Sequence, residues 1–319
     1  MAIDHYVPQV HLKQFYADEL GEKLYAFRKS DASFFTPSAR SVCGIADGNT
    51  NAYFENPRIV EEFLRTVEPH YARYVQQLRS GDIEVDCVAC LSGFMAYVAT
   101  CSPTAVRIFR PTLESTVHEY VRKLDAEGQI PKPPPELGKS LSDVLDRGLI
   151  DITIDQKYPQ AIGIEQIWNL LNAFGNSLWE IVHNPYDESP FFTSDYPVAP
   201  IILDQQPTGL MRVVPLAPNL AIKVFPDRNS DRRHEPDEFP DFRYVIKTAS
   251  RPEVHLMNTA IVRSAESFVF ANHNREWVRR FVRNNAGYRV EMRTDRRPVT
   301  DGAYLFSRLS VERKESPTS

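Results

Sequence analysis

The segment Val85–Thr100 constrains the fold most, because it reads as a helix that is apolar almost all round. Such a helix cannot lie at a surface and has to be covered by other elements. Asp86, Ser92 and Gly93 interrupt the apolar run, which is also too short for a transmembrane helix. The segment therefore predicts a central core helix, and no membrane partner is expected.

Amphipathic helices are predicted on both sides of this segment. Apolar residues recur at three- and four-residue spacing over residues 57–78, so one face of that helix is buried. Ser102-Pro103 begins another helix over residues 104–127, and a long one is expected over 160–183. The proline-rich stretch 130–135 predicts an extended connector.

The second half of the chain has a strand pattern. A short strand is expected early, at residues 23–27, but most strands come later, at 191–193, 198–203, 211–215, 221–225, 288–292 and 304–307. Helices are expected at 252–268 and 275–284, a polar surface loop at 225–241, and a disordered tail at 311–319.

This order of elements is typical of an α+β fold rather than of alternating βαβ units. We predict a helical first half packed on a mainly antiparallel sheet from the second half. The prediction is one α+β domain over residues 1–310, with its helical part at about 56–184 and its sheet-rich part at about 190–308.

Charge and cysteine content limit the partners and the compartment. The net charge of −5 gives no general attraction to nucleic acid, which would need a local patch such as the eight arginines of Arg275–Arg297. The alternative is a solvated arginine-rich surface. Cys87 and Cys90 form a C-x-x-C, but no further ligands follow, so we predict buried cysteines without zinc. With no secretion pattern at the start, a cytoplasmic location is expected.

Familiar catalytic motifs are absent from the sequence. It has no P-loop, no G-x-G-x-x-G, no H-E-x-x-H and no G-x-S-x-G. Nucleotide hydrolysis, dinucleotide binding, zinc proteolysis and α/β-hydrolase chemistry therefore lack their usual support, and the cofactor stays unknown.

The opening of the chain places polar residues among apolar ones. His5, Gln9 and Lys13 alternate with Tyr6, Val7, Leu12 and Phe15, whose spacing predicts that the segment is ordered and buried. A histidine can exchange protons near neutral pH, and a lysine can stabilise an anion. The structural alternative is a histidine with satisfied hydrogen bonds and a glutamine that caps backbone groups.

Two later polar residues stand out for the same reason. Asp195 follows Phe191 and Phe192 at a predicted strand end, where functional side chains are common. Asn258 lies inside an apolar helix, where asparagine is mildly unfavourable. The structural alternatives are turn formation by Asp195 and a backbone hydrogen bond from Asn258.

These motifs together resemble a bacterial family, domain of unknown function 4238, known for an opening HYVPQ motif. The resemblance rests on His5–Gln9 with Phe15, on Phe192-Thr193-Ser194-Asp195-x-Pro197-Val198, on Pro215–Pro218, and on Asn258 and Ala265. It implies that Glu61, Glu62 and Glu68 fall where the family has helix carboxylates. Where family members often carry an arginine before Thr-Pro, this chain has Cys101-Ser102-Pro103.

Two functions remain open from the sequence. One is an enzyme, most plausibly a phosphodiester hydrolase such as an RNase-like toxin or a phage-defence effector. His5, Gln9, Lys13, Glu68, Asp195 and Asn258 would be its site residues, with no metal assigned. The other is a binding or interaction protein that uses Arg275–Arg297 as its docking surface. We further predict that His5 and Asp195 contact each other or one shared ligand.

Overall fold

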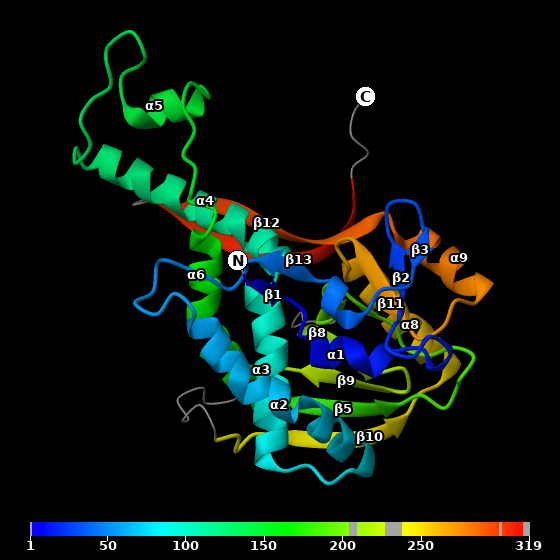
Figure 1. Ribbon diagram of the computed structural model, residues 1–319. Coiled ribbons are helices and arrows are strands. Elements are labelled where there is room, and N and C mark those ends of the chain that lie inside the picture. Colours follow the sequence, from blue (N-terminus) through cyan, green and yellow to red (C-terminus); the bar gives the residue numbers. More distant parts are fainter. Residues whose placement is uncertain (1, 204–208, 227–237, 300–301, 315–319) are drawn as a thin grey trace.

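The computed structural model describes residues 2–203, 209–226, 238–299 and 302–314. Its α-helices are α1 (Gln9–Leu12), α2 (Ile59–Ser80), α3 (Val85–Cys101), α4 (Pro103–Ala126), α5 (Leu141–Asp146), α6 (Tyr158–Glu165), α7 (Ile167–Gly175), α8 (Arg251–Ser264) and α9 (Glu276–Asn285). Short 3₁₀ turns are η1 (Lys13–Phe15), η2 (Asp18–Leu20) and η3 (Ala39–Ser41). Figure 1 shows α2 and α3 beside the strands β5 and β10 at one end of the molecule.

Helix α3 is the core helix that its sequence predicted, because every residue from Cys90 to Cys101 is buried. It packs against α2 so closely that a Cβ on Gly93 would meet the side chains of Val67 at 3.0 Å and Phe63 at 3.2 Å. The same apolar cluster includes Trp179, a residue of the sheet, so α2, α3 and α7 share one core with the strands. The predicted α+β class, with a helical layer on a mainly antiparallel sheet, is confirmed.

The main sheet has five strands in the order β10 (Arg243–Thr248), β5 (Leu178–His183), β9 (Leu220–Phe225), β8 (Gly209–Ala217) and β7 (Ala199–Leu203). Only β10 and β5 run parallel, and the other neighbours are antiparallel.

One prediction here was wrong: residues 160–183 do not form a single helix. The helical part ends at Gly175, and 178–183 is the strand β5. Trp179 and Ile181 are buried on one face of β5 and Val182 on the other, so its apolar run resembles that of a helix.

A second sheet joins the two ends of the chain. Its order is β3 (Phe34–Phe35), β2 (Tyr25–Arg28), β11 (Phe268–Ala271) and β6 (Thr193–Ser194), and all its pairs are antiparallel. The strand β11, near the end of the chain, therefore lies between strands from the N-terminal segment and from the middle. The expected strand at 23–27 is confirmed as β2, whereas the helix expected at 252–268 ends at Ser264 and gives way to β11.

The C-terminal hairpin is longer than the sequence indicated. Strands β12 (Tyr288–Val299) and β13 (Gly302–Arg313) pair in register, and Figure 1 shows the long helix α4 lying along them. Strand β13 continues to Arg313, inside the segment expected to be a tail; residues 315–319 lie outside the described residues, as does most of the predicted loop 225–241.

Among the described residues, no single helix combines the length and the hydropathy that a membrane span requires. Helices α2 and α3 reach both only when taken as a pair, and that pair is bent by 118° at its junction.

Candidate functional site

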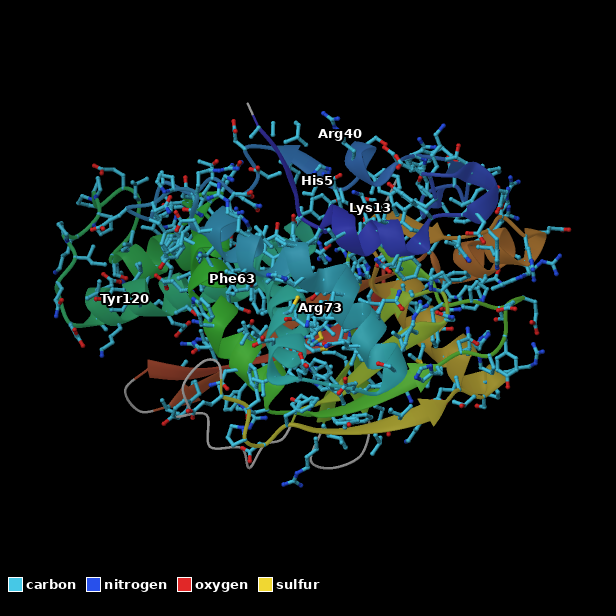
Figure 2. All side chains as sticks on the ribbon, turned by 60° about the horizontal axis from the view of Figure 1, so that its bottom comes forward. His5, Lys13, Arg40, Phe63, Arg73 and Tyr120 are labelled. Carbon is cyan, nitrogen blue, oxygen red and sulfur yellow. The ribbon has the colours of Figure 1, made fainter. Side chains whose placement is uncertain are left out.

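The N-terminal motif is an ordered part of the structure, as predicted. Strand β1 (Ile3–His5) pairs antiparallel with β4 (Gly44–Ala46), and α1 begins directly after Pro8. The side chains of Val7, Leu12 and Phe15 are completely buried. These anchors fix the polar side chains between them, and Figure 2 shows His5 and Lys13 on the same side of the molecule.

His5 has a partner on each ring nitrogen. Its Nε2 lies 3.0 Å from the carbonyl oxygen of Arg40, which can only accept, so Nε2 carries a hydrogen. Its Nδ1 lies 3.3 Å from the side-chain nitrogen of Gln9, which donates to it. These contacts assign Nε2 as the hydrogen-bond donor of the ring and Nδ1 as its acceptor, which Gln9 covers.

Lys13 and Glu68 bring charge to the same surface. Lys13 is exposed and lies four residues, about one helical turn, after Gln9. Glu68 of α2 is half-buried; burial and the charge of Glu61 raise the pKa of its carboxyl, while Lys13 opposes this rise. We call Gln9, Lys13 and Glu68 the α1–α2 cluster. It pairs an acid that holds its proton more tightly than usual with an exposed cation.

Glu61 is held by Asn49, which is held in turn by Tyr97, and sequence reasoning selected neither residue. The side-chain amide of Asn49 donates to Glu61 at 2.6 Å. The Tyr97 hydroxyl lies 3.1 Å from the side-chain oxygen of Asn49 and 3.0 Å from the carbonyl oxygen of His5. Because Tyr97 belongs to α3, the core helix, through Asn49, positions Glu61 of α2 relative to β1.

Asp195 is engaged with backbone groups rather than with His5. Its buried carboxylate accepts the N–H groups of Glu266 at 2.8 Å, Ser267 at 2.7 Å and Phe268 at 3.0 Å. Burial nevertheless raises its pKa to about 6. His5 and Asp195 share no hydrogen-bond partner among the described residues, so a common ligand stays a prediction.

The motif residue whose side chain lies near Asp195 is Tyr6. The pKa of Tyr6 is raised by burial first, and also by the neighbouring Cys43 and Asp195. Tyr6, directly after His5, therefore connects the opening motif with the Thr-Ser-Asp element.

Asn258 also bonds to backbone, which agrees with its structural alternative. Its side-chain oxygen accepts the N–H of Phe192 at 2.9 Å, and its side-chain nitrogen donates to the carbonyl of Pro190 at 2.8 Å. We call Asp195 and Asn258 the α8 joint, because Asn258 ties the middle of α8 to the chain before β6 and Asp195 binds the turn after α8.

One family model matches this chain. Its description is "Protein of unknown function (DUF4238)", and the match spans residues 4–275. The chain belongs to the DUF4238 family. The resemblance expected from the motifs is thereby confirmed. Searches among curated proteins and among solved structures gave no significant match.

A fully buried histidine of this DUF4238 chain, His11, was not selected from the sequence. His11 bonds through Nδ1 to the Tyr71 hydroxyl and through Nε2 to the Thr193 hydroxyl, each at 2.7 Å. Its ring stacks on Phe94 with centroids 4.8 Å apart. Burial lowers its pKa to about 3, so the ring is neutral and links α1, α2 and β6. The one signal in the sequence was its position between two apolar residues, Val10 and Leu12.

The two cysteines of the C-x-x-C are buried and bonded to backbone. Cys87 donates to the carbonyl of Tyr74 and Cys90 to that of Val67. Burial raises the pKa of each thiol to about 12, so both are protonated at neutral pH. The absence of zinc stays a prediction.

Most arginines of Arg275–Arg297 form ion pairs with carboxylates or lie over aromatic rings. Arg289 pairs with Glu291, Arg293 with Glu312 at 2.5 Å, and Arg296 with Glu119 at 2.6 Å. Two others, Arg279 and Arg297, lie over the aromatic rings of Phe34 and Phe306. Internal pairing of this kind reduces the positive field available to nucleic acid.

Proposed function

We propose that this DUF4238 chain is a hydrolase that acts on phosphodiesters at the α1–α2 cluster. The observation that carries the proposal is the half-buried carboxyl of Glu68 on α2, whose pKa burial raises and whose surroundings include the charge of Lys13, the residue after α1. These residues are 55 positions apart in the sequence, and the charge of Lys13 acts on the pKa of the Glu68 carboxyl. Perturbed acids beside a specific charged partner are typical of catalytic sites.

Each group of the cluster has a task in this reaction. The ammonium of Lys13 would stabilise the negative oxygens of the phosphodiester. Water attacks phosphorus and the bond to the leaving oxygen breaks, while the carboxyl of Glu68, whose pKa is raised by burial, would give that oxygen its proton. Once Gln9 turns away, Nδ1 of His5 can accept the proton that the water loses.

A second candidate function is binding of a partner through the C-terminal hairpin. Tyr304 is 64% exposed and Phe306 is 48% exposed, and Arg297 lies 4.8 Å above the ring of Phe306. Aromatic and arginine side chains of this kind are enriched in protein interfaces. This alternative predicts a chain without hydrolytic activity.

The hydrolase proposal is tested by turnover of bis(p-nitrophenyl) phosphate and of labelled RNA and DNA oligonucleotides. We expect Glu68→Gln and Lys13→Met each to lower turnover by about 100-fold or more, because a general acid and a group that stabilises developing negative charge each contribute that much. The matched control is Glu62→Gln, an exposed carboxylate of the same helix, which should leave turnover unchanged. Absence of any turnover by the folded wild type, or full activity of Glu68→Gln, would refute the proposal.

A further inference from the structure

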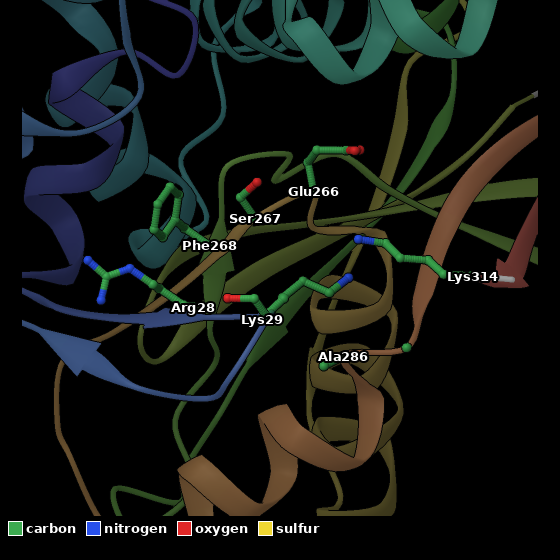
Figure 3. A pocket seen from close by; sticks show the side chains of 9 residues that line it. Arg28, Lys29, Glu266, Ser267, Phe268, Ala286 and Lys314 are labelled. Carbon is green, nitrogen blue, oxygen red and sulfur yellow. The ribbon is translucent and has the colours of Figure 1, made fainter. Parts of the chain in front are cut away.

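A cavity lined by both polar and apolar groups lies away from the α1–α2 cluster, where segments from the N-terminal and C-terminal parts of the chain meet. It has a volume of about 550 Å³ and is bounded by the end of β2, the turn between α8 and β11, the link from α9 to β12, and the end of β13. Lysines face it from opposite sides, Lys29 after β2 and Lys314 after β13. Figure 3 shows their ammonium groups pointing toward each other.

Lys29 lies at the floor of the cavity, where burial first, and then the charge of Lys314, lower the pKa of its ammonium to about 7. Only 5% of Lys29 is exposed. Its ammonium donates to three backbone carbonyls, those of Arg263 at 3.3 Å, Ala265 at 2.5 Å and Tyr288 at 2.7 Å. An ammonium has three N–H groups, so Lys29 uses all of them on the protein and contributes its field rather than a free donor.

No described residue accepts a hydrogen bond from the ammonium of Lys314. Among the described residues, no carboxylate lies within ion-pair distance of Lys29 or Lys314. Glu266 lines the cavity, but it is bound by Arg107, whose Nη2 lies 2.9 Å and Nε 3.2 Å from it. The guanidinium of Arg28 points away, over the ring of Phe35. The cavity therefore holds two facing lysines whose repulsion is only partly offset.

We propose that this cavity binds the phosphoryl group of a small phosphorylated molecule between Lys29 and Lys314. Two lysines suit a phosphate monoester, which carries about 1.5 to 2 negative charges near neutral pH. The volume falls within the range of small-molecule sites, about 300 to 1,000 Å³, and leaves room for more than phosphate alone. The ring of Phe268 and the hydroxyl of Ser267 line the remaining space.

The proposal does not depend on hydrolysis at the α1–α2 cluster. Lys314 also lies outside residues 4–275, the part of the chain matched by the family model. The variant that tests the cavity is Lys314→Met rather than a change at Lys29, because removal of Lys29 would leave three buried carbonyls without a donor.

The experiment is calorimetric titration of the full chain with inorganic phosphate, adenosine monophosphate and adenosine. We expect both phosphate-bearing probes to bind the wild type, and Lys314→Met to weaken them by at least tenfold with an unchanged melting temperature. The matched control, Lys139→Met, removes an exposed lysine elsewhere and should bind as the wild type does. Tighter binding of adenosine monophosphate than of phosphate would identify a nucleotide-like ligand, and equal binding would identify the phosphoryl group alone.

Three results would overturn the proposal. One is no binding of either phosphate-bearing probe at 10 mM. The second is equal affinity in the wild type and Lys314→Met. The third is binding of adenosine as tight as that of adenosine monophosphate, because recognition would then not involve the phosphoryl group.

Discussion

The α1–α2 cluster and the α8 joint contain similar polar residue types, but the side chains of the two regions differ in their bonding partners. In the joint, Asp195 accepts three backbone N–H groups and Asn258 both accepts and donates to backbone. In the cluster, Lys13 is exposed and Glu68 is half-buried, and their interaction is one of charge. A polar residue with every atom bonded to backbone holds the fold, whereas one with unused charge can act on a ligand.

The difference has an energetic basis. A buried polar group costs several kcal/mol unless it is hydrogen-bonded, so the residues of the joint can be retained for stability alone. The cluster gains little stability from a carboxyl whose pKa is raised, since its ionised form is disfavoured in the fold. Groups of that kind are common where function opposes stability.

The largest effect on stability should come from breaking the joint. Asp195→Ala would leave the N–H groups of residues 266–268 buried without an acceptor, and we expect the free energy of unfolding to fall by about 3 kcal/mol. Denaturant unfolding at pH 7 measures this. Asp187→Ala, at an exposed position, is the matched control and should change stability by less than about 0.5 kcal/mol.

A smaller but pH-dependent effect is expected at His11. Burial lowers its folded pKa to about 3 from the usual 6.5, so the stability it contributes is present above pH 6.5 and is lost as the pH falls toward 3. His11→Gln should cost about 2 kcal/mol at pH 7, because two buried hydrogen bonds are weakened. The gap to the wild type should narrow by up to about 1.4 kcal/mol per pH unit in that window. If the difference in unfolding free energy between the wild type and His11→Gln does not change with pH, the pKa of His11 is not lowered in the fold.

Much of the helical layer could be predicted from the sequence because its apolar spacing was regular. The helices α2, α3 and α4 were found within a few residues of their ends. The strand β5 was missed because it carries apolar residues on both faces and so continues the apolar run of α7. The hairpin β12–β13 was underestimated because one face carries paired charges, such as Arg293 with Glu312.

The site was predictable only in part, for a different reason. The local motif supplied His5, Gln9 and Lys13, and the resemblance pointed to Glu68. The partners of Asp195, however, are backbone N–H groups more than 70 residues away in the sequence. Almost every residue type has such a group, so the sequence does not indicate which ones Asp195 binds. Tyr97 and Asn49, which position Glu61, look like ordinary core and loop residues in the sequence.

The smallest effect on stability, and the sharpest contrast with the joint, is expected at Glu68. Its folded pKa is raised, so the stability linked to its protonated form is present below the usual glutamate pKa of 4.5 and is lost as the pH rises through the folded value. Glu68→Gln carries no charge and avoids that loss, so at pH 7 to 8 it should be at least as stable as the wild type, within about 0.5 kcal/mol. Any advantage should disappear below pH 4.5. Glu62→Gln shows the effect of removing one exposed charge from the same helix. If Glu68→Gln instead unfolds as readily as Asp195→Ala, Glu68 is a structural residue and the cluster does not differ from the joint.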